Sequence, residues 1–170
     1  MMRIRPALLF AASLLLHTSG ISAMSPLPFF QRVERVGLLC VVDADGGLSA
    51  DLGAGLGDDA LCGRAAAVLS DLLASGPAVT AFAPNDARIA DPGTLLLLVH
   101  ATLRPDDKGQ GGRLLALAAT LQRTGSVGGA PFFMTPPQAL ALSGGVEENL
   151  LDSMLRRLFH PLAKALGANP

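Results

Sequence analysis

Two cysteines, Cys40 and Cys62, are the residues whose type and spacing indicate the most definite chemistry in this sequence. Cys40 stands at the end of a predicted strand and Cys62 in the first turn of a predicted helix, and there is no third cysteine to compete. A redox-active or metal-binding pair would need Cys-x-x-Cys spacing or neighbouring histidines, and the sequence has neither. We therefore predict a structural disulfide that closes a loop of about 23 residues and stabilises the fold by about 3 kcal/mol.

Acidic side chains crowd the segment 43–59, which contains five aspartates and five glycines. Asp43, Asp45 and Asp51 could together bind a calcium ion weakly, because carboxylate oxygens are ligands that this ion prefers. A regular calcium loop is not predicted, since the fifth, sixth and twelfth positions counted from Asp43 are glycine, leucine and alanine. A solvated acidic loop is the simpler interpretation.

Glycines in the segment 53–57 precede a predicted helix, as they do in phosphate-binding loops. However, Asp58 stands where a dinucleotide-binding fingerprint has its third glycine, and no Lys-Ser or Lys-Thr pair follows. His100 and His160 come without the acid and nucleophile motifs of known hydrolases. We therefore expect no cofactor, and a non-catalytic role is favoured over an enzyme.

Hydrophobic periodicity predicts the elements that must position these residues. Segment 113–124 is rich in helix-forming residues, but its place after a polar hairpin loop favours a strand over a helix. The predicted helices cover 59–74 and 147–166, and the predicted strands cover 32–42, 78–83, 94–104, 113–124, 130–135 and 138–142.

These elements predict a single α/β domain of the α+β type over 32–167, built in two layers. Its sheet should be rich in antiparallel pairs and contain four or five strands, with both amphipathic helices packed on one face. If Leu96 and Leu98 point away from the helices, they form an apolar patch beside His100 on the other face. Because such a patch needs a partner, a ligand or a lid, we predict an interaction face there.

The N-terminal residues predict export. Arg3 and Arg5 precede an apolar run over 7–16, so we interpret 1–23 as a signal peptide, followed by an extended lead-in over 24–31. The apolar run is too short to span a bilayer, so no stable membrane insertion is expected after cleavage. The 14 acidic residues outnumber the basic residues beyond the leader, which argues against nucleic acid as a partner. The predicted location is the periplasm or the extracellular medium.

The order strand, helix, strand, strand, strand, helix resembles the small periplasmic α/β modules of envelope assembly. The helix end at Ala74-Ser75-Gly76 and the corner at Thr124-Gly125 after a long strand belong to this resemblance. The N-terminal domain of the Tol–Pal propeller protein and the curli secretion lipoprotein are of this kind. The resemblance implies a protein that holds partners and does not catalyse.

The predicted function is therefore binding of another cell-envelope component, either a different protein or a second copy of this chain as a homo-oligomer. The alternative function is that of a small secreted hydrolase or ligand-binding protein with a pocket near the 43–59 loop.

Overall fold

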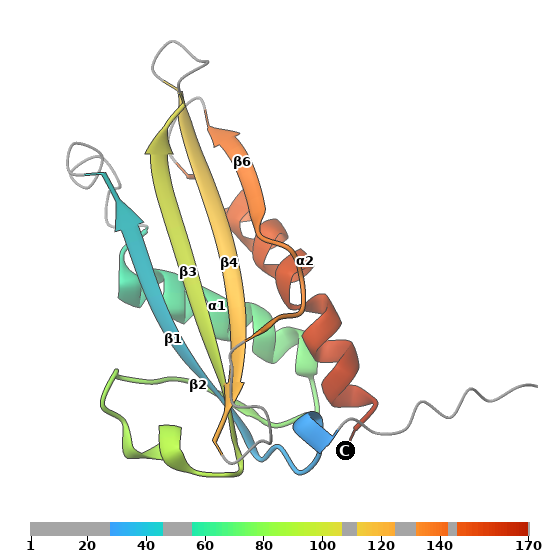
Figure 1. Cartoon of the computed structure of the whole chain (residues 1–170). Coiled ribbons are helices and arrows are strands. Elements are labelled where there is room, and N and C mark those ends of the chain that lie inside the picture. The colour runs from blue at the N-terminus through green and yellow to red at the C-terminus, as the bar shows by residue number, and fades with distance from the viewer. Residues whose placement is uncertain (1–27, 46–55, 107–111, 125–131, 143–145, 170) are drawn as a thin grey trace, which may run out of the picture.

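The computed structural model describes residues 28–45, 56–106, 112–124, 132–142 and 146–169 (Figure 1). The predicted signal peptide, 1–23, lies outside the described residues. The elements in chain order are η1 (Pro28–Phe30), β1 (Arg35–Ala44), α1 (Asp58–Leu73), β2 (Ala78–Ala81), η3 (Ala87–Ala90), β3 (Thr94–Pro105), β4 (Arg113–Arg123), β5 (Phe132–Phe133), β6 (Gln138–Leu142) and α2 (Glu148–Gly167).

The strands form one mixed sheet in the order β2-β1-β3-β4, with β5 and β6 both pairing with the far side of β4. β1 runs parallel to β2 and to β3. The pairs of β4 with β3, β5 and β6 are antiparallel. Since β5 and β6 share one edge of β4, the sheet is five strands wide and mostly antiparallel, as predicted.

Alternation of side chains explains why β4 is a strand despite its helix-forming composition. Leu115, Leu117, Ala119 and Leu121 are all buried on one side of the strand, opposite the buried residues of β3. In a helix these residues would not share one face, because the helical period is 3.6 residues and not two. Packing therefore overrides the local preference, and the prediction of a strand over this segment is confirmed.

Both helices lie on the same face of the sheet, behind it in Figure 1. Their apolar stripes pack against the strand side chains that point toward the helices. Together these residues form one core. The largest fully buried side chains of this core are Phe159, Leu38, Leu56, Leu61, Leu69, Leu95, Leu97, Leu103, Leu115, Leu117, Leu121 and Met154. The two-layer α+β architecture predicted from the sequence is thus confirmed.

No helix within the described part of the chain is both long enough and apolar enough to cross a membrane.

Of the extended lead-in predicted over 24–31, the described part, 28–31, is not extended. Pro28–Phe30 form a short 3-10 helix, and Phe30 is buried in the core. Arg32 has a φ of 55°, which turns the chain so that β1 begins at Arg35, three residues later than predicted. The cause lies far along the chain, because the Arg123 guanidinium donates hydrogen bonds to the carbonyl oxygens of Phe29, Gln31 and Arg32. Because the backbone turns at Arg32, all three carbonyl oxygens point toward the Arg123 side chain.

Candidate functional site

We call the face of the sheet opposite the helices the open face. Among the described residues, the large apolar side chains with the highest exposed fraction lie on it. Val41 on β1 is 45% exposed, and Leu98 on β3 and Leu114 on β4 are each 39% exposed. The register places Val41 and Leu98 close together in the middle of the face, whereas Leu114 lies opposite Arg104 toward one end. A surface of this kind is more often an interaction site than an isolated exposed leucine is.

The strand register places the three residues predicted for this face together. Leu98 lies between Leu39 of β1 and Thr120 of β4, and His100 lies between Val41 and Ala118. These neighbours share a face because side chains alternate along each strand. Leu96 is half-buried on the same face, whereas Leu98 and His100 are exposed. The middle of the open face is therefore apolar, with one imidazole in it.

One end of the open face is covered by the chain that follows β2. The ring of Phe82 packs against Gly37, where a Cβ atom would meet the ring carbon Cε2 at 2.2 Å. The Arg88 guanidinium lies 4.5 Å from the centre of this ring, and its Nη2 atom is 2.6 Å from Oδ2 of Asp86. Sequence reasoning missed this cover because it placed Phe82 inside a strand over 78–83, whereas β2 ends at Ala81.

The other end of the open face carries an ion-pair cluster. Nη2 of Arg104 lies 2.6 Å from Oδ2 of Asp43, and its Nη1 atom lies 3.2 Å from Oδ1 of Asp45. The hydrogen bond from Arg104 lowers the pKa of the Asp43 carboxyl, and the nearby charge of Arg104 acts in the same direction. A calcium ion at Asp43 and Asp45 would have to displace this guanidinium. Asp51, the third residue predicted for such a site, lies outside the described residues.

The disulfide predicted from the sequence is present and joins β1 to α1. The sulfur atoms of Cys40 and Cys62 are 2.05 Å apart, and the two Cα atoms are 5.4 Å apart. A second link lies beside it, because the backbone N–H of Val42 donates a hydrogen bond of 2.8 Å to Oδ1 of Asp58. Together these contacts hold the first turn of α1 against the sheet.

The histidines do not form a catalytic arrangement with acids among the described residues. His100 and His160 are both exposed, and neither makes a hydrogen bond to a carboxylate in that part of the chain. No group of three or more His, Cys, Asp or Glu side chains there could hold a metal ion. Within the described part of the chain, neither histidine is therefore paired with an acid as the general base of a hydrolase would be.

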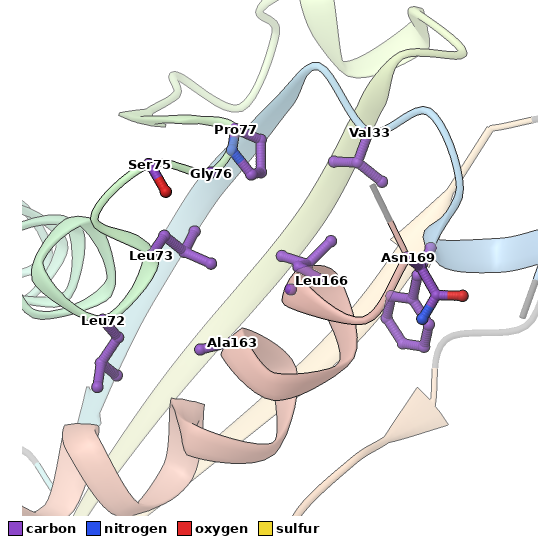
Figure 2. A pocket seen from close by; sticks show the side chains of 11 residues that line it. Val33, Leu72, Leu73, Ser75, Gly76, Pro77, Ala163, Leu166 and Asn169 are labelled. Atoms are coloured by element: carbon purple, nitrogen blue, oxygen red, sulfur yellow. The ribbon is translucent and has the colours of Figure 1, made fainter. Parts of the chain in front are cut away.

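Two cavities are lined by described residues outside the segment 43–59. One, of about 540 Å³, has apolar side chains from three segments, including Val33, Leu72 and Leu166, with Asn169 at one end (Figure 2). The other, of about 590 Å³, lies between the helices beside Arg64 and is more polar. Arg64 is already bound there by Glu148 and Asp152, at 2.6 and 2.9 Å. Residues 46–55 of that segment lie outside the described residues, so the alternative of a pocket near the 43–59 loop stays a prediction.

The fold and the open face thus define a two-layer α+β protein with an exposed apolar sheet surface. No protein-family model matches the chain, and no curated protein matches its sequence. Among solved structures, a dodecamer of a PelC variant from Paraburkholderia phytofirmans is similar, with 14% identity and a TM-score of 0.44. The similarity covers 78% of this chain and 90% of that chain.

A minor lipoprotein from Acinetobacter baumannii is also similar, with 16% identity and a TM-score of 0.29 over 78% of this chain and 87% of that chain. These identities and TM-scores are too low to transfer a function to this chain. The resemblance to the Tol–Pal and curli modules stays a prediction.

Proposed function

We propose that this chain is an exported, non-catalytic protein that binds another component of the cell envelope through its open face. The observation that carries the proposal is the exposed apolar pair in the middle of the open face, Val41 at 45% and Leu98 at 39%, on the adjacent strands β1 and β3. Burying this surface against a partner would remove apolar area from water, at about 25 cal/mol per Å². The helices cannot supply that cover, because both lie on the other face.

The charges around the open face support a partner that is apolar and uncharged where it makes contact. At one end Arg104 is paired with Asp43 and Asp45, and at the other Arg88 is paired with Asp86. Since the basic groups at both ends already have acidic partners, they offer little to a highly charged ligand. An apolar centre with a polar rim is the usual anatomy of a protein–protein interface. The partner would then be a protein, and a second copy of this chain is one such partner.

Export is part of the proposal because it accounts for both the leader and the disulfide. A basic start followed by an apolar run is the signature of a signal peptide, and the Cys40–Cys62 bond is stable in an oxidising compartment. The periplasm and the extracellular medium both satisfy this requirement.

Site-specific photocrosslinking in the exporting cell tests the proposal. A photoreactive amino acid at position 98 should give a discrete crosslinked product, identifiable by mass spectrometry. The same amino acid at position 67 is the control, because Ala67 is exposed on α1 and faces away from the sheet. Leu98→Arg should abolish the product formed from a probe at position 41. Equal crosslinking from positions 98 and 67, or none from either, would refute binding through the open face.

A further inference from the structure

The open face is divided along its length into a half with large side chains and a half with small ones. The large half lies on β1 and β3, where Leu39, Val41, Leu96 and Leu98 point to this face. They share the face because side chains alternate along each strand and the residues between them, such as Val99, are buried in the core. Val41 and Leu98 are the most exposed of the four, at 45% and 39%.

The small half lies on β4 and β6, which run beside β3 on the side away from β1 (Figure 1). Its members are four alanines, Ala116 and Ala118 on β4 and Ala139 and Ala141 on β6. They point to the open face because the residues between them, Leu117 and Leu140, pack in the core. Since Ala116 and Ala139 are opposite each other in register, the alanines form one patch. Another protein can therefore approach the sheet more closely over this patch than over Val41 and Leu98.

The two halves complement each other when two sheets stack face to face about a two-fold axis that runs along the strands, between β3 and β4. β3 of one copy then lies over β4 of the other, and β1 lies over β6. Because His100 and Ala118 are opposite each other in register, His100 of each copy lies over Ala118 of the other. An axis across the strands would instead place Val41 and Leu98 of both copies against each other.

The size of the open face is sufficient for such a dimer. β1, β3 and β4 each have at least ten residues. With a rise of about 3.3 Å per residue and a strand spacing of about 4.8 Å, these three strands present roughly 500 Å². Two copies stacked face to face would bury about 1,000 Å² or more, which is the lower limit for a specific interface.

The charges on the open face are compatible with this arrangement. The Arg104 guanidinium is paired within its own copy with Asp43 and Asp45, at 2.6 and 3.2 Å. Asp43 lies on β1, so the Asp43 residues of the two copies would be on opposite sides of the two-fold axis. His100 would lie over an alanine and not over a second histidine.

We propose that the open face binds a second copy of this chain, with the large half of each copy packed against the small half of the other. This inference rests on the proposed function, that the open face binds a protein, and it names that protein.

Sedimentation velocity of the purified mature chain, with its disulfide intact, tests the proposal over a range of concentrations. The wild-type chain should form a reversible dimer. Ala118→Leu should weaken this dimer on the order of tenfold, because the added side chain holds the two sheets apart. Simple hydrophobic association would instead become stronger, since leucine adds apolar area. Ala67→Leu is the control, because Ala67 is exposed on α1. Leu98→Ala should also weaken the dimer on the order of tenfold.

Photocrosslinking tests the geometry without changing the small half. A photoreactive amino acid at position 100 should link the two copies in a product of twice the chain mass. Mass spectrometry of that product should place the link in β4, around Ala118. A link in β3 would overturn the proposal, because it would indicate an axis across the strands.

The remaining outcomes separate this inference from the proposed function. Unchanged or stronger association of Ala118→Leu would overturn the packing of large half against small half. If the wild-type chain is monomeric at all concentrations but a probe at position 98 captures a different protein in the exporting cell, the inference is wrong and the proposed function stands. If the chain is monomeric and position 98 captures nothing, both are wrong.

Discussion

The ring of Phe82 occupies the space that a side chain on Gly37 would need. A Cβ atom built on Gly37 would lie 2.2 Å from Cε2 and 2.4 Å from Cδ2 of Phe82. Phe82 is 7% exposed, and the Arg88 guanidinium lies over its outer side. The ring is therefore held between the sheet and a cation, and it cannot retreat without exposing its apolar surface.

We expect Gly37→Ala to destabilise the protein by about 1–3 kcal/mol, because the added methyl group overpacks the contact with Phe82. The measurement is urea denaturation at neutral pH. Gly63→Ala is the matched control, since a Cβ atom at Gly63 would meet nothing within 4 Å and the residue lies inside α1. Alanine in a helix is more favourable than glycine, so the control should gain up to about 1 kcal/mol. Similar losses in both variants would contradict the packing explanation.

The hydroxyl group of Thr94 offers a second test, because it is buried and has no hydrogen-bond partner among the described residues. Thr94 is 1% exposed, and no atom in the described part of the chain forms a hydrogen bond with its Oγ1. Burial of an unpaired hydroxyl costs about 1–3 kcal/mol in proteins, so Thr94→Val should stabilise the fold by about 1 kcal/mol. Thr94→Ser keeps the hydroxyl and loses the methyl group, so its melting temperature should fall. A lower melting temperature for the valine variant would show that the hydroxyl has a partner in solution.

The pairing of Asp86 with Arg88 predicts how stability changes in acid. Hydrogen bonds from the Arg88 side chain and backbone lower the pKa of Asp86 to about 2 from its usual 3.8. A lowered pKa in the folded state stabilises the protein above the unfolded value, and the contribution disappears as the pH falls from about 4 to about 2.

Asp86→Asn should therefore be less stable than the wild-type protein at pH 6, and the difference should shrink as the pH falls through this window. The measurement is the midpoint of urea unfolding between pH 6 and pH 2. Asp59→Asn removes a carboxylate away from the Arg88 pair and is the control. A difference between Asp86→Asn and wild type that stays constant across the window would rule out a role for this ionisation.

Much of the fold could be predicted from the sequence because its signals are local. A continuous apolar run identified β3, the position after a polar hairpin loop identified β4, and the apolar stripes identified both helices, so the two-layer arrangement followed. The placement of Leu96, Leu98 and His100 on one face follows from the alternation of side chains along a strand. These features depend on sequence patterns within each element and not on contacts with residues far away in the sequence.

The parts that sequence reasoning missed depend on contacts between distant residues. Arg123 bends the segment around Arg32, which lies 91 positions earlier, and no local pattern at either residue indicates this contact. Phe82 follows a predicted strand, and nothing local in the sequence indicates that its ring packs over Gly37. Asp58 is typical of a helix start, and only the structure shows that its carboxylate binds Val42. Each of these contacts requires knowing which elements are neighbours.

The last prediction is that removal of the Cys40–Cys62 disulfide lowers the stability of the fold and leaves binding through the open face unchanged. The bond holds α1 to β1 on the helix side of the sheet, while Leu98 and Leu114 lie on the open face. Replacing both cysteines by serine should lower the free energy of unfolding by about 3 kcal/mol, since the unfolded chain is no longer constrained by the closed loop. Crosslinking from position 98 should persist at temperatures where the variant is folded. The wild-type protein with added reductant is the control and should melt like the variant. If the variant melts at the same temperature as the oxidised wild type, the bond does not stabilise the fold. If crosslinking disappears while the variant is folded, binding through the open face depends on the disulfide.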